Sequence, residues 1–225
     1  MKRIFSLLFA CALLASCERD PIEIRPQAAV VSLNIHKVTT AAPVEILVNH
    51  YRLLSPTDTS HFIGNIDWGD GNITEFDNVA GGSINYPHNY IVAGLYNIKI
   101  TFDKPTAVTS LSFIFRGVTQ TDTLLSLTGH AGTPYLKYLV LQNTRLKTLD
   151  ISANFNIERL WLSGNCLTEA TVNNLLTHVD SYTVSNLTPS PEFYLNGQIP
   201  IAPPTGSGLV AKQSLFNKRC QIQTD

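Results

Sequence analysis

The chain has 225 residues, of which 44% are hydrophobic and 15% charged, so it is long enough for one large or two small domains with a buried core. Its 16 basic and 17 acidic residues give a formal net charge of −1 at pH 7. This balance provides no basic field for a polyanion, so the sequence predicts no nucleic-acid partner.

The N-terminal segment MKRIFSLLFACALLASC has the pattern of a secretory signal. It combines a basic start, an apolar run over residues 4–15 that is too short to span a bilayer, and small residues before Cys17. Leu-Ala-Ser-Cys at residues 14–17 resembles the motif of bacterial lipoprotein signals. The resemblance implies that residues 1–16 are cleaved off as a signal peptide and that Cys17 is acylated, which would anchor the chain in a membrane. The alternative is a soluble secreted protein in which this Cys occurs by chance.

Residues 17–27 form a short polar segment that we interpret as a tether between the lipid and the folded part. Glu18 and Asp20 resemble the acidic export tag that some Gram-negative groups use to send lipoproteins to the outer face. The tag predicts an outer-membrane protein that faces the cell exterior. Because the tag is short, the periplasmic face stays an alternative.

Cysteine use agrees with an exported protein. Cys11 leaves with the signal and Cys17 is lipidated, so the folded part keeps Cys166 and Cys220. A disulfide between these two is allowed by the compartment but is not indicated by their spacing, and buried free thiols are favoured. The chain contains no CxxC pair and no HExxH, so we expect no metal site and no cofactor.

The region that follows the tether has the pattern of β-strands. AAVVSLNI (28–35) and VEILVNHYRLL (44–54) alternate or run apolar between Pro, Asp, Ser and Thr breaks. In YNIKITF (96–102) the apolar residues fall at every second position, which gives the strand one buried and one wet face. These patterns predict an all-β module.

The stretch GNIDWGDGNITEF (64–76) could be a metal loop, a catalytic site or a turn. Counted from Asp67, Gly69 and Gly71 stand where an EF-hand loop needs oxygen ligands, so that pattern fails. Asp67 and Asp70 could form a carboxylate pair for acid–base chemistry, but two acids in one loop are weak evidence. Asp-Gly after an apolar strand favours a hairpin turn.

Two motifs in this half resemble those of the polycystic-kidney-disease (PKD) domain, although that family more often has Phe before the first Gly. The motifs consist of Trp68, Gly69, Asp70 and Gly71, followed by His88, Tyr90, Gly94, Tyr96, Ile98 and Ile100. The resemblance implies an immunoglobulin-like β-sandwich over residues 28–104, with a hairpin corner at the glycines. It also implies that His88 is a buried hydrogen-bonding residue and not a base. Some relatives bind calcium near such loops, but no ligand set can be mapped onto this chain.

Three segments in the second half follow Leu-x-x-Leu-x-Leu-x-x-Asn-x-Leu fully or in part. They begin at Leu136, Leu146 and Ile157; the third fits best, while the first has Thr144 in the Asn position and the second has Asn156 in place of a Leu. Leu139 and Leu160 are 21 residues apart, a step typical of leucine-rich repeats, which the segments resemble. The resemblance implies a short solenoid with inward leucines and an Asn that binds backbone groups at the bend.

The ends of such a solenoid need covering, and the sequence predicts how. Thr168 is a candidate N-cap for a helix with Leu175, Leu176 and Val179 on one face, and residues 206–222 predict a helix and then a strand. TPSPEF and IPIAPPTGSG are expected to be loops within this end piece. Residues 105–225 would therefore form a leucine-rich repeat domain with capping segments, similar to the repeat region of cell-surface lipoproteins.

The sequence thus predicts a mainly β protein with some α: an immunoglobulin-like β-sandwich followed by a short leucine-rich repeat solenoid. The six histidines are dispersed and there is no GxSxG, so we expect a non-catalytic surface protein that mediates binding or adhesion to an extracellular protein or glycan. The alternative is an accessory or targeting subunit of a secreted hydrolase system. Neither the ligand nor the oligomeric state follows from the sequence.

The residues between the inward leucines are candidates for the binding surface, because side chains alternate along a strand. They are Tyr138, Val140 and Gln142 in one coil and Arg159, Trp161 and Ser163 in the next. Such Tyr, Arg and Trp side chains are enriched in binding hot spots. The alternative is that the sandwich or the Pro-rich loops cover Trp161.

Overall fold

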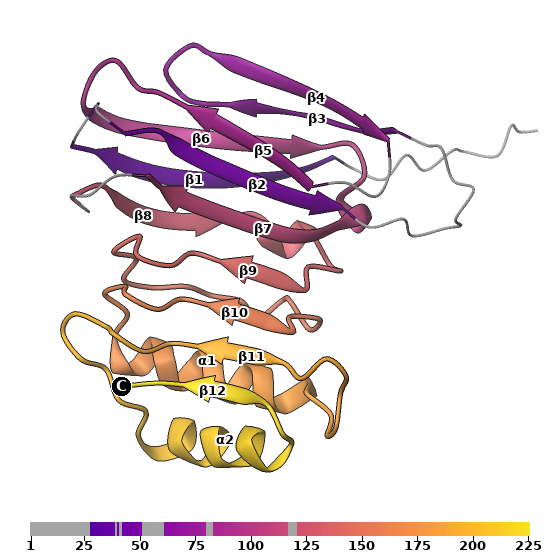
Figure 1. The fold of residues 1–225 in the computed structure, drawn as a ribbon, viewed down its shortest axis with the longest axis vertical. Helices are drawn as coiled ribbons and strands as arrows, with labels where there is room; N and C mark the ends of the chain where they lie inside the picture. Colours follow the sequence, from indigo (N-terminus) through magenta and orange to yellow (C-terminus); the bar gives the residue numbers. More distant parts are fainter. Residues whose placement is uncertain (1–27, 39, 41, 51–60, 80–82, 117–120) are drawn as a thin grey trace, which may run out of the picture.

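Alternating apolar and polar positions along most of the chain produce strands, and these strands form two sheets (Figure 1). The structure is a computed structural model that describes residues 28–38, 40, 42–50, 61–79, 83–116 and 121–225. These residues form 12 strands, two α-helices and two short 3-10 helices, η1 (Pro105–Ala107) and η2 (His130–Gly132). The prediction of a mainly β chain with some α is confirmed.

The first sheet has five strands that pair only in antiparallel fashion. Its order is β4-β3-β6-β1-β8. The strands are β1 (Ala29–Lys37), β3 (His61–Asp67), β4 (Ile73–Val79), β6 (Gly94–Phe102) and β8 (Thr123–Thr128).

The second sheet has seven strands in the order β12-β11-β10-β9-β7-β2-β5, and it changes character at β7. On one side of β7 the pairs are antiparallel, and on the other side they are parallel. The strands are β2 (Val44–His50), β5 (Ser83–His88), β7 (Val108–Phe115), β9 (Tyr138–Val140), β10 (Arg159–Trp161), β11 (Glu192–Tyr194) and β12 (Gln221–Gln223).

The apolar faces of the two sheets share one interior. In β1, Val31, Leu33 and Ile35 are buried, while Ser32 and Asn34 between them are partly exposed, as a period of two requires. Leu33 of the first sheet and Leu111 of the second line the same small internal space of about 10 Å³. Interiors packed this tightly contribute most of the stability of a domain.

The Trp-Gly-Asp-Gly segment is the turn between β3 and β4, as its sequence predicts. Trp68 N donates to Asn72 O at 3.0 Å, and Gly69 and Gly71 have φ values of 78° and 93°, which favour glycine. The Asp70 carboxylate accepts a hydrogen bond from Asn72 N at 3.0 Å. The Asp side chain therefore caps the turn.

A ring cluster holds this turn against the end of β5. The Trp68 ring is fully buried, donates through Nε1 to Thr74 Oγ1 at 2.8 Å and stacks on His88 with centroids 4.5 Å apart. His88 Nε2 lies 2.7 Å from Asp70 Oδ2, and Tyr90 donates its hydroxyl to Trp68 O at 2.8 Å. His88 is thus a hydrogen-bonding residue of the turn, although it is partly exposed and not fully buried as expected.

The structure differs from the expected boundary after residue 104. Strands β7 and β8 come later in the chain, yet β7 pairs with β2 and β8 pairs with β1. Strand β7 also pairs in parallel with β9, so one continuous sheet joins the two halves. The sequence interpretation ended the strand-rich module at β6 because the two motifs that carried the resemblance end there.

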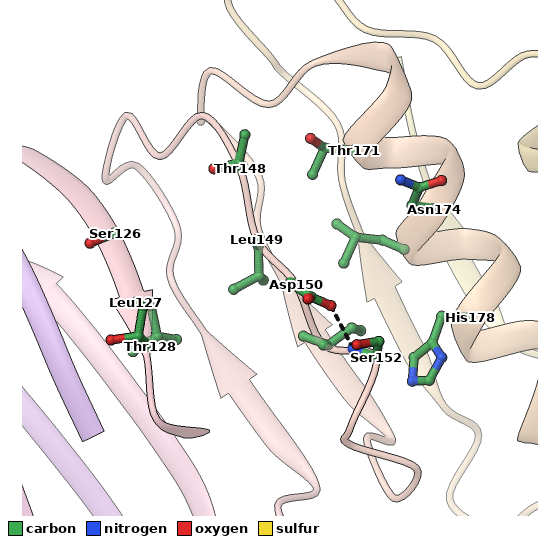
Figure 2. A pocket seen from close by; sticks show the side chains of 12 residues that line it. Ser126, Leu127, Thr128, Thr148, Leu149, Asp150, Ser152, Thr171, Asn174 and His178 are labelled. Atoms are coloured by element: carbon green, nitrogen blue, oxygen red, sulfur yellow. Dashed lines mark hydrogen bonds between the residues drawn. The ribbon is translucent and has the colours of Figure 1, made fainter. Parts of the chain in front are cut away.

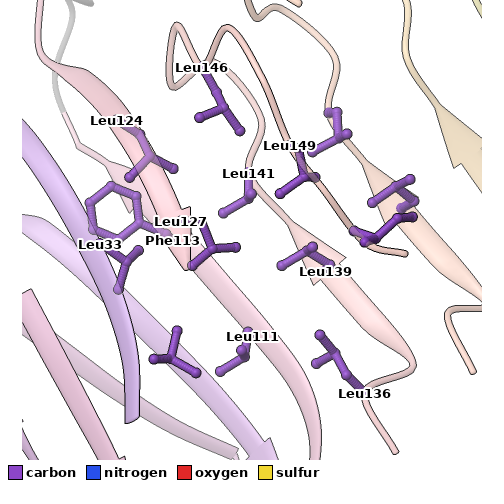
Figure 3. Close-up of a cluster of buried hydrophobic side chains, with 14 of the residues drawn as sticks. Leu33, Leu111, Phe113, Leu124, Leu127, Leu136, Leu139, Leu141, Leu146 and Leu149 are labelled. Atoms are coloured by element: carbon purple, nitrogen blue, oxygen red, sulfur yellow. The ribbon is translucent and has the colours of Figure 1, made fainter. Parts of the chain in front are cut away.

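The second half consists of coils whose strands stack in register. Leu139, Leu160, Phe193 and Ile222 are directly paired across β9, β10, β11 and β12. Figure 3 shows that the leucines of these coils continue the interior formed by Leu33, Leu111 and Leu127. The core therefore runs through both halves without a break.

The segment that begins at Leu146 fits the repeat motif but forms no strand. It starts only half a coil after Leu136, so it runs along the return side of the coil between β9 and β10. Its Leu149 and Ile151 are buried from that side. The motif therefore recurs on both sides of this coil, because it does not encode which side a segment occupies.

Asn165 binds the backbone at the bend of its coil, as predicted. Its Oδ1 accepts from Thr144 N at 3.0 Å and from Leu146 N at 3.1 Å, and its Nδ2 donates to Leu141 O and Leu162 O at 2.7 and 2.8 Å. Gln198 does the same in the next coil, donating to Leu162 O at 3.0 Å and Leu195 O at 2.8 Å. These bonds satisfy buried carbonyls that no strand partner reaches.

Two helices complete the return sides of the later coils. Helix α1 (Glu169–Tyr182) is capped by Thr168, whose side chain accepts from Thr171 N at 3.2 Å, and it buries Leu175, Leu176 and Val179. The helix and strand expected at residues 206–222 are α2 (Gly206–Asn217) and β12. The segment TPSPEF, expected to be a loop, contributes Glu192 and Phe193 to β11.

Candidate functional site

The parallel strands arrange their outward side chains in two rows across the sheet. The first row is Tyr138, Arg159, Glu192 and Gln221, and the second is Val140, Trp161, Tyr194 and Gln223. All eight side chains are partly or fully exposed. We call these eight residues the ladder face.

The first row compensates its own charges. The Arg159 guanidinium lies over the Tyr138 ring at 5.1 Å from the centroid, and its Nε is 3.3 Å from Glu192 Oε1. Glu192 Oε2 accepts a hydrogen bond from Trp161 Nε1 at 3.1 Å. The carboxylate therefore fixes both a cation and an aromatic ring, so the face offers ordered side chains with little net charge.

The second row is an aromatic stack. Trp161 and Tyr194 lie with centroids 5.8 Å apart and an interplanar angle of 15°, and the Tyr194 hydroxyl donates to Gln221 Oε1 at 3.0 Å. The stack runs from strand to strand within the sheet, so each ring turns one face toward the other.

The structure brings all six predicted binding residues onto one face. Tyr138, Val140, Arg159 and Trp161 belong to the ladder face, and Gln142 and Ser163 continue the register because Asn143 N donates to Ser163 O at 2.9 Å. Ser163 donates its hydroxyl to Asn196 Oδ1 at 2.7 Å.

Trp161 is only partly buried and is not one of the fully buried core residues. Tyr194, which follows the Pro-rich segment TPSPEF, flanks one side of the Trp161 ring. The expectation that the C-terminal loops would cover Trp161 therefore holds for one side of its ring only.

Sequence reasoning missed Glu192, Tyr194, Gln221 and Gln223. The sequence PEFYLNGQ (191–198) could have revealed this strand. It follows the repeat motif if Phe193 occupies a Leu position and Gln198 occupies the Asn position. The step from Leu160 to Phe193 is 33 residues, because α1 is inserted in that coil. A search for a constant step of 21 residues could not find it.

A second candidate site is an open cavity of about 660 Å³ on the other side of the coils (Figure 2). It lies between β8, the return segment 148–152 and helix α1. Asp150 Oδ1 accepts from Ser152 N at 2.9 Å, and hydrogen bonds from Ser152 hold the pKa of the Asp150 carboxyl below its usual value. Sequence analysis did not predict this cavity, because its residues come from three distant segments with no common motif.

Two histidines lie in or beside the cavity, and both bind backbone carbonyls. Its His178 Nε2 is hydrogen-bonded to Asn154 O at 3.0 Å, and the nearby His130 Nε2 to Asp150 O at 2.7 Å. Neither imidazole is bonded to a hydroxyl of the cavity in the part of the chain that the structure describes. The described residues also contain no group of three or more His, Cys, Asp or Glu side chains arranged to hold a metal ion.

Cys166 and Cys220 are free thiols, partly exposed and buried respectively, and burial raises the pKa of Cys220. The signal peptide, the tether and Cys17 lie outside the described residues. Within the described ranges, no helix is both long and apolar enough to cross a membrane. Comparisons with protein-family models, with curated proteins and with solved structures found no match.

Proposed function

We propose that this chain is a non-catalytic lipoprotein of the bacterial outer membrane, facing the cell exterior, that binds an extracellular protein through the ladder face. Its two halves would be a PKD-like, immunoglobulin-like sandwich and a short leucine-rich repeat solenoid. The observation that carries the proposal is the register of β9 to β12, which gathers Tyr138, Arg159, Trp161 and Tyr194 on one exposed surface.

The composition and order of the ladder face support binding. Trp, Tyr and Arg dominate the energetics of protein interfaces. Trp and Tyr bury a large area with few rotatable bonds, and Arg offers a planar guanidinium with several donors. Here Glu192 already holds Arg159 and Trp161 in place, so a partner would not need to order them. A pre-ordered surface loses less side-chain entropy on binding.

The ring orientation favours a protein ligand over a glycan at this face. A sugar packs its C–H groups against the open face of an aromatic ring, where the π electrons are concentrated. Trp161 and Tyr194 each turn one face toward the other ring, so less open ring surface is left for a sugar than two isolated rings would offer. Apolar and hydrogen-bonding groups of a protein surface fit such a pattern.

Truncation of Trp161 tests the ladder face. In a screen of extracellular matrix and bacterial surface proteins, Trp161→Ala should weaken binding of any ligand found by about 2 kcal/mol or more. Its free energy of unfolding should fall by less than about 1 kcal/mol, because the ring is only partly buried. Calorimetric titration and chemical denaturation measure the two quantities.

Phe216→Ala is the matched control, since Phe216 is an aromatic residue on α2 with 67% exposure that lies outside the ladder face. It should leave affinity unchanged. Wild-type affinity of the Trp161→Ala protein would contradict the proposal. So would a loss of roughly 3 to 5 kcal/mol of stability, which is the cost of removing a core aromatic.

Replacing Cys17 tests the lipid anchor. Cys17→Ala should leave the precursor uncleaved and without acyl chains, because the thiol is the predicted acceptor. Labelling of expressing cells with radioactive palmitate, followed by detergent partitioning, measures both effects. Incorporation of palmitate into the Cys17→Ala protein would contradict the proposal that Cys17 carries the lipid anchor.

A further inference from the structure

The cavity beside α1 is separated from the ladder face by the leucine core. Its walls are β8, the return segment 148–152 and the side of α1 that carries Asn174 and His178 (Figure 2). A volume of about 660 Å³ lies within the range of roughly 300 to 1,000 Å³ that small-ligand sites occupy.

Hydrogen-bonding groups of both kinds line the cavity. The Asn174 side chain is exposed and makes no hydrogen bond or ion pair within the described residues, so its amide can donate and accept. Asp150 and Thr148 are exposed on the opposite wall, with the Asp150 carboxylate ionised at neutral pH. Ser126 and Ser152 add hydroxyls, which both donate and accept.

The same lining argues against other classes of small ligand. No Lys or Arg is among the described residues that line the cavity, so a phosphate or sulfate would meet no cation there and would face Asp150. The lining is of mixed polarity, because Leu127, Leu149 and Leu175 lie beside the hydroxyl, amide and carboxylate groups. Such a lining favours an uncharged molecule that carries both hydroxyl and apolar C–H groups.

An exposed aromatic ring stands beside one end of the cavity. Phe155 is 56% exposed, and its ring makes an edge contact with His178 at 4.9 Å between centroids. Unlike Trp161, Phe155 has no ring stacked parallel to it within the described residues. The exposed part of its ring can contact the C–H groups of a ligand.

We propose that this cavity is a binding site for a neutral saccharide. Asp150 and Asn174 bind its hydroxyl groups from opposite walls, and Phe155 packs against a neighbouring sugar unit. The chain then carries two recognition surfaces, one for protein on the strand side of the coils and one for glycan on the helix side.

The test uses the full chain in a zwitterionic detergent and titrates defined hexasaccharides by calorimetry. The neutral probes are maltohexaose, cellohexaose, mannohexaose and xylohexaose; hexagalacturonate and spermidine are the charged comparisons. We expect saturable binding of at least one neutral probe and none of the charged ones. Asn174→Ala should weaken that binding about tenfold or more, and Phe155→Ala should weaken it by a smaller factor.

Thr177→Ala is the matched control, because Thr177 is an exposed residue of α1 that does not line the cavity. It and Trp161→Ala should both bind the saccharide as the wild type does, and thermal melting should show that every variant is folded. Asn174→Ala is not expected to perturb the fold, since the Asn174 side chain is exposed and has no hydrogen-bond partner among the described residues.

Absence of binding by all four neutral probes would overturn the proposal. Binding that Asn174→Ala and Phe155→Ala leave unchanged, or preferential binding of spermidine or hexagalacturonate, would also overturn it. Because the ladder face is tested with protein ligands and Trp161→Ala, failure of one proposal leaves the other standing.

Discussion

Gly69 and Gly71 share a positive φ in the turn between β3 and β4, yet their surroundings differ. A Cβ at Gly69 would lie 2.6 Å from the backbone oxygen of Asn97, whereas a Cβ at Gly71 would meet no atom within 4 Å. Gly71→Ala should therefore cost about 1 kcal/mol of stability, because alanine is strained at a positive φ even where its Cβ meets no other atom. Gly69→Ala should cost roughly 3 kcal/mol or more, because the backbone of β6 must also move.

Chemical denaturation of the two variants measures this difference. Equal losses would mean that the approach of the turn to Asn97 is unimportant. Asp70→Asn in the same turn should have a small effect, because an amide oxygen can still accept from Asn72 N. A melting temperature that rises with calcium in the wild type and not in Asp70→Asn would revive the metal-loop hypothesis.

His130 should make stability depend on pH near neutrality. Burial lowers the pKa of His130 and outweighs the hydrogen bond to Asp150 O, which raises it; Nδ1 is buried without a partner among the described residues. The folded state therefore favours neutral imidazole, and the unfolded state binds the proton first as pH falls. The stability that the folded state gains from neutral His130 is fully present above the unfolded pKa of about 6.5 and is lost as pH falls below that value.

The variant His130→Gln isolates this effect, because Gln can still donate to Asp150 O and does not titrate. Between pH 7.5 and 5.5, the melting temperature should fall further for the wild type than for the variant. The other histidines and the carboxylates are common to both proteins, so they cancel in the comparison. Parallel pH profiles would contradict the assignment.

At the scale of the coil, Asn165 replaces strand pairing where the chain bends. It is 1% exposed, and its removal would leave two buried backbone N–H groups, those of Thr144 and Leu146, without a partner among the described residues. Since one buried orphaned group costs about 1 to 3 kcal/mol, Asn165→Ala should destabilise the chain by roughly 3 kcal/mol or more. Asn156→Ala, which removes one exposed bond to Pro134 O, should cost less than about 1 kcal/mol.

Denaturant titrations of both Asn variants test the role of the bend. A loss below 1 kcal/mol in Asn165→Ala would mean that water can replace the side chain there. The structure gives no room for that, because Thr144 and the neighbouring Leu141 and Leu162 are also buried.

At the scale of the whole molecule, the shared sheet and core predict that both halves unfold together. Strand β7 pairs with β2 on one side and with β9 on the other, and Leu111, Leu127 and Leu139 line one internal space. The chain holds two tryptophans, Trp68 in the first half and Trp161 in the coils of the second half. Each is thus a reporter for one half.

Single-tryptophan variants make this measurable. Trp161→Phe reports on the first half through Trp68, and Trp68→Phe reports on the coils through Trp161. For each variant, the fluorescence midpoint should coincide with the midpoint of far-ultraviolet circular dichroism, as two-state unfolding requires. If either ring reports a transition separate from the backbone signal, the halves are independent domains.

The sequence alone determined those features that depend on local periodicity and turn chemistry. Alternation predicted β1, β2 and β6, Asp-Gly predicted the β3–β4 turn, and helical spacing after Thr168 predicted α1. The outward positions of Tyr138, Arg159 and Trp161 also followed, because a strand has only two faces. Each of these inferences uses residues that are close together in the chain.

Only the tertiary structure decided how distant segments meet. Strand β7 joins β2, strand β8 joins β1, and residues 146–156 form a return segment. These arrangements depend on pairing between distant segments, which no local pattern encodes. Asp150 and His178 line one cavity, and Trp161 stacks on Tyr194. The sequence did not reveal these contacts, because the residues are far apart in the chain and become neighbours only when the coil that contains helix α1 folds. Hydrophobic burial drives the coils together without regard to sequence distance, so the sites it creates appear only in the folded chain.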